Sequence, residues 1–133
     1  MRKKLTDEWK ERGVKEGVEY AILTDEMTKA WSGLTVKEYK ELKGLKKENL
    51  RDNMTDIELV LNMLAEVTTT TLSKKEQPET FAENRSVAKR GGKFAGDTRK
   101  RFEEEIGGKV ISPLNASDKP ALETKKDNDE NKD

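Results

Sequence analysis

The sequence predicts an all-α protein, a compact bundle of about five to six helices with a disordered, charged C-terminal tail. Two observations support this fold class. Apolar residues recur at intervals of three and four along several stretches, which is the spacing of one helix face. Glycines follow these stretches, and Thr-x-x-Glu capping boxes precede two of them, so helix ends are marked as well as helix faces.

Two helices are expected before Gly33. Leu5 and Trp9 lie four residues apart in the first of them, which covers about residues 4–12. The second is expected to begin at Thr24, because a threonine side chain can accept a hydrogen bond from the backbone of the first helical turn. It continues to Gly33, a residue type that commonly ends helices.

Two capping boxes mark the next helices. In the first, Thr35 and Glu38 are expected to bond to each other's backbone amides, and Thr55 and Glu58 do the same in the second. A short helix over about residues 47–52 is expected between them. The helix after Thr55 has the strongest apolar pattern in the chain and is expected to be central. Its predicted buried face consists of Ile57, Val60, Leu61, Leu64, Val67, Thr68, Thr71 and Leu72.

The last predicted helix covers about residues 79–106, follows Pro78 and ends at Gly107. On one of its faces the side chains are small in the first half of the helix and large in the second half. The residues of this face are Ala88, Gly92, Ala95, Phe102 and Ile106, with Gly91 and Gly96 beside them. Each glycine inside a helix costs roughly 1 kcal/mol relative to alanine. Either another backbone therefore approaches closely here, or the helix breaks near Gly91 and Gly92. A short extended segment near Val110 follows.

Composition limits the core and the chemistry. The chain has 133 residues, of which 41% are charged and 32% are hydrophobic, so we expect a modest core. Residues 1–116 are expected to form one helical domain, and residues 117–133, rich in Lys, Asp, Glu and Asn, a disordered tail. Without cysteine or histidine, a Ser-His-Asp or Cys-His nucleophile is impossible. We therefore expect no enzyme, no cofactor and no metal site.

No stretch is apolar enough to cross a membrane, and no secretory leader is recognised, so the cytoplasm is the expected location. Charge is balanced over the whole chain but not along it. Residues 85–101 contain seven basic residues and one acid, Asp97. A basic stretch of this kind can contact phosphate groups of a nucleic acid, or it can be a solvated helix face that neighbouring acids neutralise.

Two sets of candidate residues follow from this last helix. The candidate nucleic-acid-binding residues are Arg85, Lys89, Arg90, Lys93, Phe94, Arg99 and Arg101, with Phe94 as the aromatic residue that could stack on a base. The candidate residues for close helix packing or for an interface are Ala88, Gly91, Gly92, Ala95 and Gly96. The second set permits two interpretations, a close crossing of helices within the chain or the seam of a homodimer.

Four segments resemble the C-terminal domain of the DNA-damage-inducible protein D family, which overlaps the Bro-type, phage antirepressor-like proteins. In the printed sequence they read LKGLKKENLRD from Leu42, MTDIEL from Met54, AKRGGKFAG from Ala88 and EEIGG from Glu104. Together with RGV at Arg12 they keep the order of the family over about residues 5–116. Members usually carry an N-terminal Bro domain, thought to bind DNA, and this chain is expected to begin directly at the second domain.

The resemblance implies a role in the DNA-damage (SOS) response or in phage-type regulation, and it offers no catalytic residues to transfer. Two hypotheses follow. The first is a non-catalytic regulatory or accessory protein that binds a DNA-repair or recombination protein and single-stranded DNA. The second is a self-associating helical structural or phage-type regulatory module with no nucleic-acid contact, which would be a homodimer.

Overall fold

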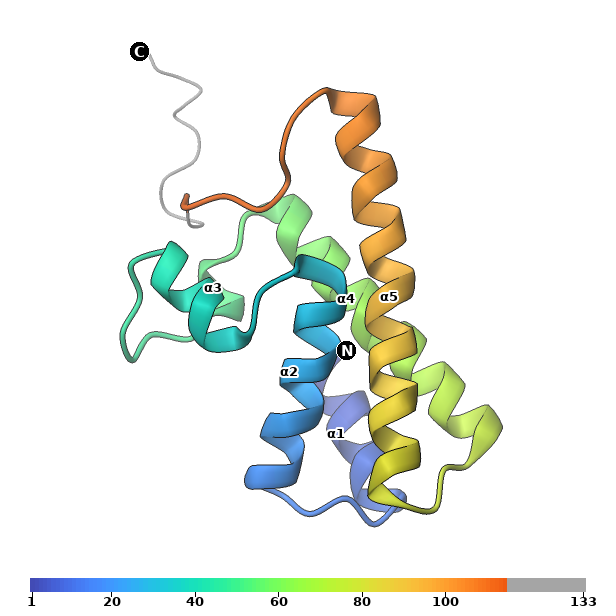
Figure 1. Ribbon diagram of the computed structural model, residues 1–133. Helices are drawn as coiled ribbons and strands as arrows, with labels where there is room; N and C mark the ends of the chain where they lie inside the picture. Colours follow the sequence, from blue (N-terminus) through green and yellow to red (C-terminus); the bar gives the residue numbers. More distant parts are fainter. Residues whose placement is uncertain (115–133) are drawn as a thin grey trace.

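The computed structural model describes residues 1–114 and shows a bundle of helices (Figure 1). The predicted all-α class is confirmed, and no strand occurs among the described residues, so the segment around Val110 is irregular coil. The predicted tail, residues 117–133, and the domain boundary at residue 116 lie outside this part of the chain. The helices are α1 Arg2–Glu11, α2 Val18–Ser32, α3 Val36–Leu42, the 3-10 helix η1 Arg51–Asn53, α4 Asp56–Glu76 and α5 Phe81–Ile106.

The long helix α5 organises the bundle, since its two most extensive contacts are with α2 on one side and with α4 on the other. Helix α1 packs mainly on α4, and the short helix α3 packs on α2. Figure 1 shows α5 running beside both partners, with its last turns rising beyond them. The largest fully buried apolar side chains lie where these helices meet; they are Trp9, Trp31, Tyr39, Leu5, Leu23, Met27 and Leu61.

Capping boxes begin three of the helices. The two predicted ones are confirmed, with the Glu38 backbone amide 3.2 Å from Thr35 Oγ1 and the Thr55 amide 2.8 Å from Glu58 Oε1. The third, Thr80 with Glu83, begins α5 at Phe81. Its Thr-x-x-Glu pattern was visible in the sequence, but the neighbouring Pro78 drew the predicted start of this helix two residues too early.

The predicted start of α2 is wrong. The helix begins at Val18, after Gly17 with a φ of 83°. Thr24 lies inside the helix, where its hydroxyl donates to the carbonyl oxygen of Tyr20 at 2.8 Å. A threonine hydroxyl can donate to a carbonyl oxygen of the preceding turn within a helix, so a threonine in the sequence does not by itself mark the start of a helix. Gly33, in the left-handed conformation, ends the helix as predicted.

The short helix predicted over residues 47–52 is a single 3-10 turn, Arg51–Asn53.

The predicted buried face of α4 is wrong in part: Leu61 is buried and Ile57 and Leu64 pack against the core, but two predicted valines lie outside. Val60 is 58% exposed and Val67 39% exposed. The residues that α4 buries are mostly polar: Glu58, Leu61, Asn62, Ala65, Glu66, Thr69, Thr70 and Ser73. This face packs against α1, α2 and α5, and several of its polar groups find partners there: Asn62 accepts from Trp31 of α2, Glu66 pairs with Arg51 of η1, and Ser73 donates to Glu8 of α1. Hydrophobic periodicity alone cannot detect such partners.

Helix α5 is continuous through its glycines, which excludes a break there. A Cβ atom placed on Gly92 would lie 2.3 Å from the carbonyl oxygen of Met27, and one on Gly91 2.0 Å from Thr69 Oγ1. Gly96 faces the backbone of Ala30 and Trp31. These glycines therefore let α5 approach α2 and α4 closely. Ala88 and Ala95 are buried on the same face, so a homodimer seam here would require the bundle to open.

The second half of the predicted α5 face is uncovered. Phe102 and Ile106 continue the face of Ala88 and Ala95, but both are exposed. The last turns of α5 extend beyond the ends of its partner helices, so nothing from α2 or α4 covers them (Figure 1).

Gly92→Ala is expected to destabilise the fold, although alanine favours a helix by roughly 1 kcal/mol. The added methyl group must move the backbone of Met27, and overpacking of this kind typically costs about 1–3 kcal/mol or more. Chemical denaturation of the variant measures the change. Gly108→Ala is the matched control, because no atom lies within 4 Å of its added Cβ. Equal stability of both variants and the original chain would contradict the close approach.

Candidate functional site

The basic residues of α5 do not form one surface. Lys89 and Lys93 face α2, while Arg90 lies at the edge toward α4, where its Nη1 is 2.9 Å from Glu76 Oε2. Phe94 and Arg101 lie four and eleven residues after Arg90 and therefore share that edge. The predicted binding set is thus divided between two edges of one helix, and its role in nucleic-acid binding stays a prediction.

Arg85 and Arg99 are engaged in contacts with α2. Arg85 Nε donates to Glu26 Oε2 at 2.6 Å. Arg99 Nε donates to the carbonyl oxygen of Trp31 at 2.8 Å, and its Nη1 is 2.9 Å from Glu103 Oε2. Arg99 is also largely buried. Both arginines therefore hold the two helices together, which leaves the lysines as the more available cations.

A groove of about 650 Å³ lies between α2 and α5. Its lining residues are Asp25, Glu26, Lys29, Ala30, Thr35, Lys89, Lys93, Gly96, Asp97 and Lys100. Gly96 forms part of its floor, since a glycine allows the two backbones to come together there. Lys89, Lys93 and Lys100 project from α5 at a helical spacing that keeps them on one side, and Lys29 faces them from α2.

The acids of this groove already have partners. Asp25 Oδ1 accepts from the backbone amide of Val36 at 2.9 Å, and Glu26 pairs with Arg85. Asp97 pairs with Lys93 at 3.3 Å. Among residues 1–114, no ion pair or hydrogen bond engages the ammonium groups of Lys89 and Lys100. The groove therefore has four lysines against three acids, and the ammonium groups of Lys89 and Lys100 are the ones available to an anionic ligand.

Sequence reasoning did not identify this groove. Lys100 lies eleven residues after Lys89 and seven after Lys93, so helical spacing alone could have joined it to them. Lys29 is far away in the sequence, and no local signal relates it to α5.

A buried carboxylate forms a second polar centre. Glu58 Oε1 is 2.7 Å from Lys43 Nζ, and both side chains are fully buried. Glu58 Oε2 accepts from Tyr39 Oη at 2.7 Å and from the backbone amide of Ser112 at 3.2 Å. Lys43 also donates to the carbonyl oxygens of Ser112 and Leu114. This cluster fastens the segment after α5 onto α3 and α4.

Glu103 supports the same segment. Its Oε2 accepts from the backbone amide of Val110 at 3.0 Å, and Val110 is buried. Burial acts to raise the pKa of Glu103, but the hydrogen bonds from Val110 and Arg99 outweigh it and hold this pKa below its ordinary value. Both centres together hold the irregular segment over residues 110–114 in a fixed place on the bundle.

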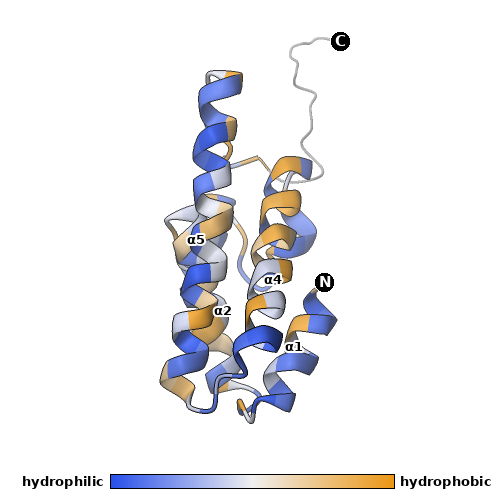
Figure 2. Cartoon of the chain, turned by 90° about the vertical axis from the view of Figure 1, so that its right-hand side faces the viewer, coloured by the Kyte–Doolittle hydropathy of each residue, from blue (hydrophilic) through white to orange (hydrophobic). Residues whose placement is uncertain are grey.

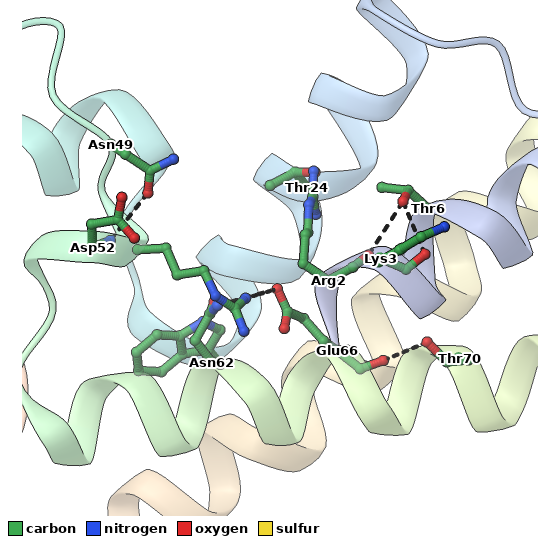
Figure 3. A network of polar contacts seen from close by, with 11 residues as sticks. Arg2, Lys3, Thr6, Thr24, Asn49, Asp52, Asn62, Glu66 and Thr70 are labelled. Atoms are coloured by element: carbon green, nitrogen blue, oxygen red, sulfur yellow. Dashed lines mark hydrogen bonds and ion pairs between the residues drawn. The ribbon is translucent and has the colours of Figure 1, made fainter.

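A third polar centre surrounds Glu66 on α4 (Figure 3). Its Oε2 is 2.5 Å from Arg51 Nη1 and 3.3 Å from Asn62 Nδ2, and Asn62 in turn accepts from the indole nitrogen of Trp31. Arg2 lies nearby and donates to Thr24 Oγ1. Burial lowers the pKa of Arg2, and the negative charge of Glu66 opposes this shift. The centre ties α1, α2, η1 and α4 together.

Within the described part of the chain, no three His, Cys, Asp or Glu side chains come close enough to hold a metal ion. None of its helices is long and apolar enough to cross a membrane. The polar centres have roles in packing, whereas the lysine-lined groove can offer charge to a ligand.

Tyr39 is expected to keep its proton at alkaline pH. Burial, followed by the contact with Glu58, raises the pKa of Tyr39 above its ordinary value. The folded state then holds a proton that the unfolded chain releases above about pH 10, so the stability due to Tyr39 is complete below that pH and falls above it. The chain has two tyrosines, so half of the tyrosinate absorbance should appear only on unfolding.

In Tyr39→Phe, the tyrosinate absorbance that appears only on unfolding should be absent. The free energy of unfolding at neutral pH should fall by about 1–3 kcal/mol, since Glu58 loses a hydrogen-bond donor. Tyr20→Phe is the control, and its remaining tyrosine, Tyr39, should still give its tyrosinate absorbance only on unfolding. Complete titration of both tyrosines in the folded protein would contradict this assignment.

A family model described as the DinD C-terminal domain matches residues 1–119 of the chain. No curated protein and no solved structure matches it.

Proposed function

Because the chain belongs to the DinD C-terminal domain family, which indicates a role related to DNA damage, we propose that it is a non-catalytic accessory protein of the DNA-damage response. In this proposal it binds single-stranded DNA and a repair or recombination protein. It has no cofactor, and it works in the cytoplasm. The observation that carries the nucleic-acid part is the groove between α2 and α5, with lysines on both sides.

The lysines suit phosphate groups better than bases. Lys29, Lys89, Lys93 and Lys100 are exposed and flexible, and an ammonium group on a long stem acts as a point charge without a fixed geometry. Such contacts give affinity and salt dependence but read no sequence. Phe94 lies on the other edge of α5, so base stacking on it would need the strand to pass around the helix. We therefore propose binding without sequence preference.

The repair or recombination partner rests on the family alone. Capture of bound proteins from cells, before and after DNA damage and with a high-salt wash, tests this part. The wash separates partners held by charge from partners held by apolar contact.

Replacement of Lys29, Lys89 and Lys100 by glutamine is expected to weaken binding of a labelled single-stranded oligonucleotide. Loss of three phosphate contacts should lower the slope of log affinity against log salt by about 2. Fluorescence anisotropy at several salt concentrations measures both quantities. The matched control replaces Lys4, Lys10 and Lys15, three exposed lysines outside the groove.

The control variant should bind with nearly the original affinity. Equal losses in both variants would mean that only net charge matters, and absence of binding at low salt by the original chain would refute the nucleic-acid role.

A further inference from the structure

The outer surface of α4 carries no charge over residues 57–73. This stretch contains two charged side chains, Glu58 and Glu66, and both point into the bundle, where they are buried. In a chain with 41% charged residues, such a surface is unusual. Figure 2 shows apolar residues along the upper turns of α4, which face the viewer without another helix in front of them.

The apolar residues on this surface follow a heptad pattern. Ile57, Val60, Leu64, Val67 and Thr71 are separated by three, four, three and four residues, the spacing of a seam between two packed helices. Val60 and Val67 are exposed, while Ile57 and Leu64 also touch the core. The five residues, here called the α4 stripe, lie along one line on the helix, and Val60 and Val67 within it are left exposed. Exposed apolar seams of this kind mark interaction surfaces.

We propose that the α4 stripe binds the α4 stripe of a second copy of this chain, with the two helices antiparallel about a two-fold axis. The charged residues at the two ends of the stripe favour a second copy of the chain as its partner. Exposed acids, Asp52 and Asp56, lie at its N-terminal end, and exposed bases, Lys74 and Lys75, at its C-terminal end. Antiparallel packing brings acids beside bases at both ends and also opposes the two helix dipoles. Parallel packing would place like charges together.

The register follows from the stripe. A two-fold axis beside Leu64 brings Val60 of one copy to Val67 of the other, and Ile57 to Thr71. The same axis places Lys74 and Lys75 of one copy between Asp52 and Asp56 of the other. Apolar contacts and charge contacts are thus satisfied together in one self-complementary arrangement, as a two-fold interface requires.

The interface is small. Residues 57–74 span about 27 Å at 1.5 Å per residue. A single helix pair of this length gives an interface near the lower limit of specific association, roughly 1,000 Å². We therefore expect a dimer that dissociates on dilution. This association is independent of nucleic-acid binding by the groove, which lies on the α2 side of α5.

Cysteine cross-linking tests the arrangement, because the chain contains no cysteine of its own. Leu64→Cys places two thiols at the two-fold axis and should form a disulfide-linked dimer on mild oxidation. Val60→Cys alone should not, since its two copies lie about 12 Å apart along the helices, or eight residues at 1.5 Å each. Mixing Val60→Cys with Val67→Cys should restore the cross-link between unlike chains. Val18→Cys, at a position exposed on α2, is the control and should stay monomeric.

Sedimentation of the unmodified chain over a wide concentration range gives an independent readout. We expect dimers at high concentration, their loss in the double variant Val60→Glu, Val67→Glu, and no change in Val18→Glu, with circular dichroism to show that each variant is folded. Efficient self-cross-linking of Val60→Cys would indicate a parallel pair and overturn the proposal. A chain that stays monomeric throughout would also overturn it, and would assign the stripe to residues 117–133 or to a different protein.

Discussion

The close approach of α5 to its neighbours determines the dimensions of the whole bundle. Gly92 and Gly96 bring its backbone against the carbonyl groups of α2, and Gly91 brings it against Thr69 of α4. Where side chains are absent, helix backbones meet directly, so little apolar volume is needed between them. A chain with 32% hydrophobic residues can therefore form a closed core around two tryptophans. The cost of three glycines in one helix is offset by this packing.

Helix α4 shows another consequence of the small share of apolar residues in the chain. Its inner face carries Glu58 and Glu66. The Glu58 carboxylate accepts from Tyr39, Lys43 and the Ser112 amide, and Glu66 Oε2 pairs with Arg51 of η1. Buried charges without such partners would be strongly destabilising. These centres fix the positions of α3, η1 and residues 110–114 on the bundle. They also displace apolar residues such as Val60 and Val67 to the outside, where they form the α4 stripe.

The two proposed binding surfaces therefore have different chemistry because they arise from different helices. The groove beside α2 has lysines whose charge exceeds what the neighbouring acids engage, and it suits a polyanion. The α4 stripe is uncharged and suits an apolar helix. Helix α5 lies between them, with its glycine face turned inward to α2 and α4. A two-fold dimer through α4 would carry two such grooves, one on each copy, and could contact one strand of nucleic acid at two places.

The sequence by itself determined the local structure: the all-α class, the capping boxes at Thr35 and Thr55 and the helix end at Gly107, because these depend on residues within one turn of each other. It also carried the motifs that identify the family. Tertiary structure alone decided which face of α4 is buried, that α5 continues through Gly91 and Gly92, and that Lys29 joins the lysines of α5. The physical reason is that burial of a polar side chain, and the tolerance of a glycine, depend on partners distant in the sequence. Periodicity reports the polarity of a residue, whereas its position in the fold depends on the hydrogen bonds and backbones that it meets.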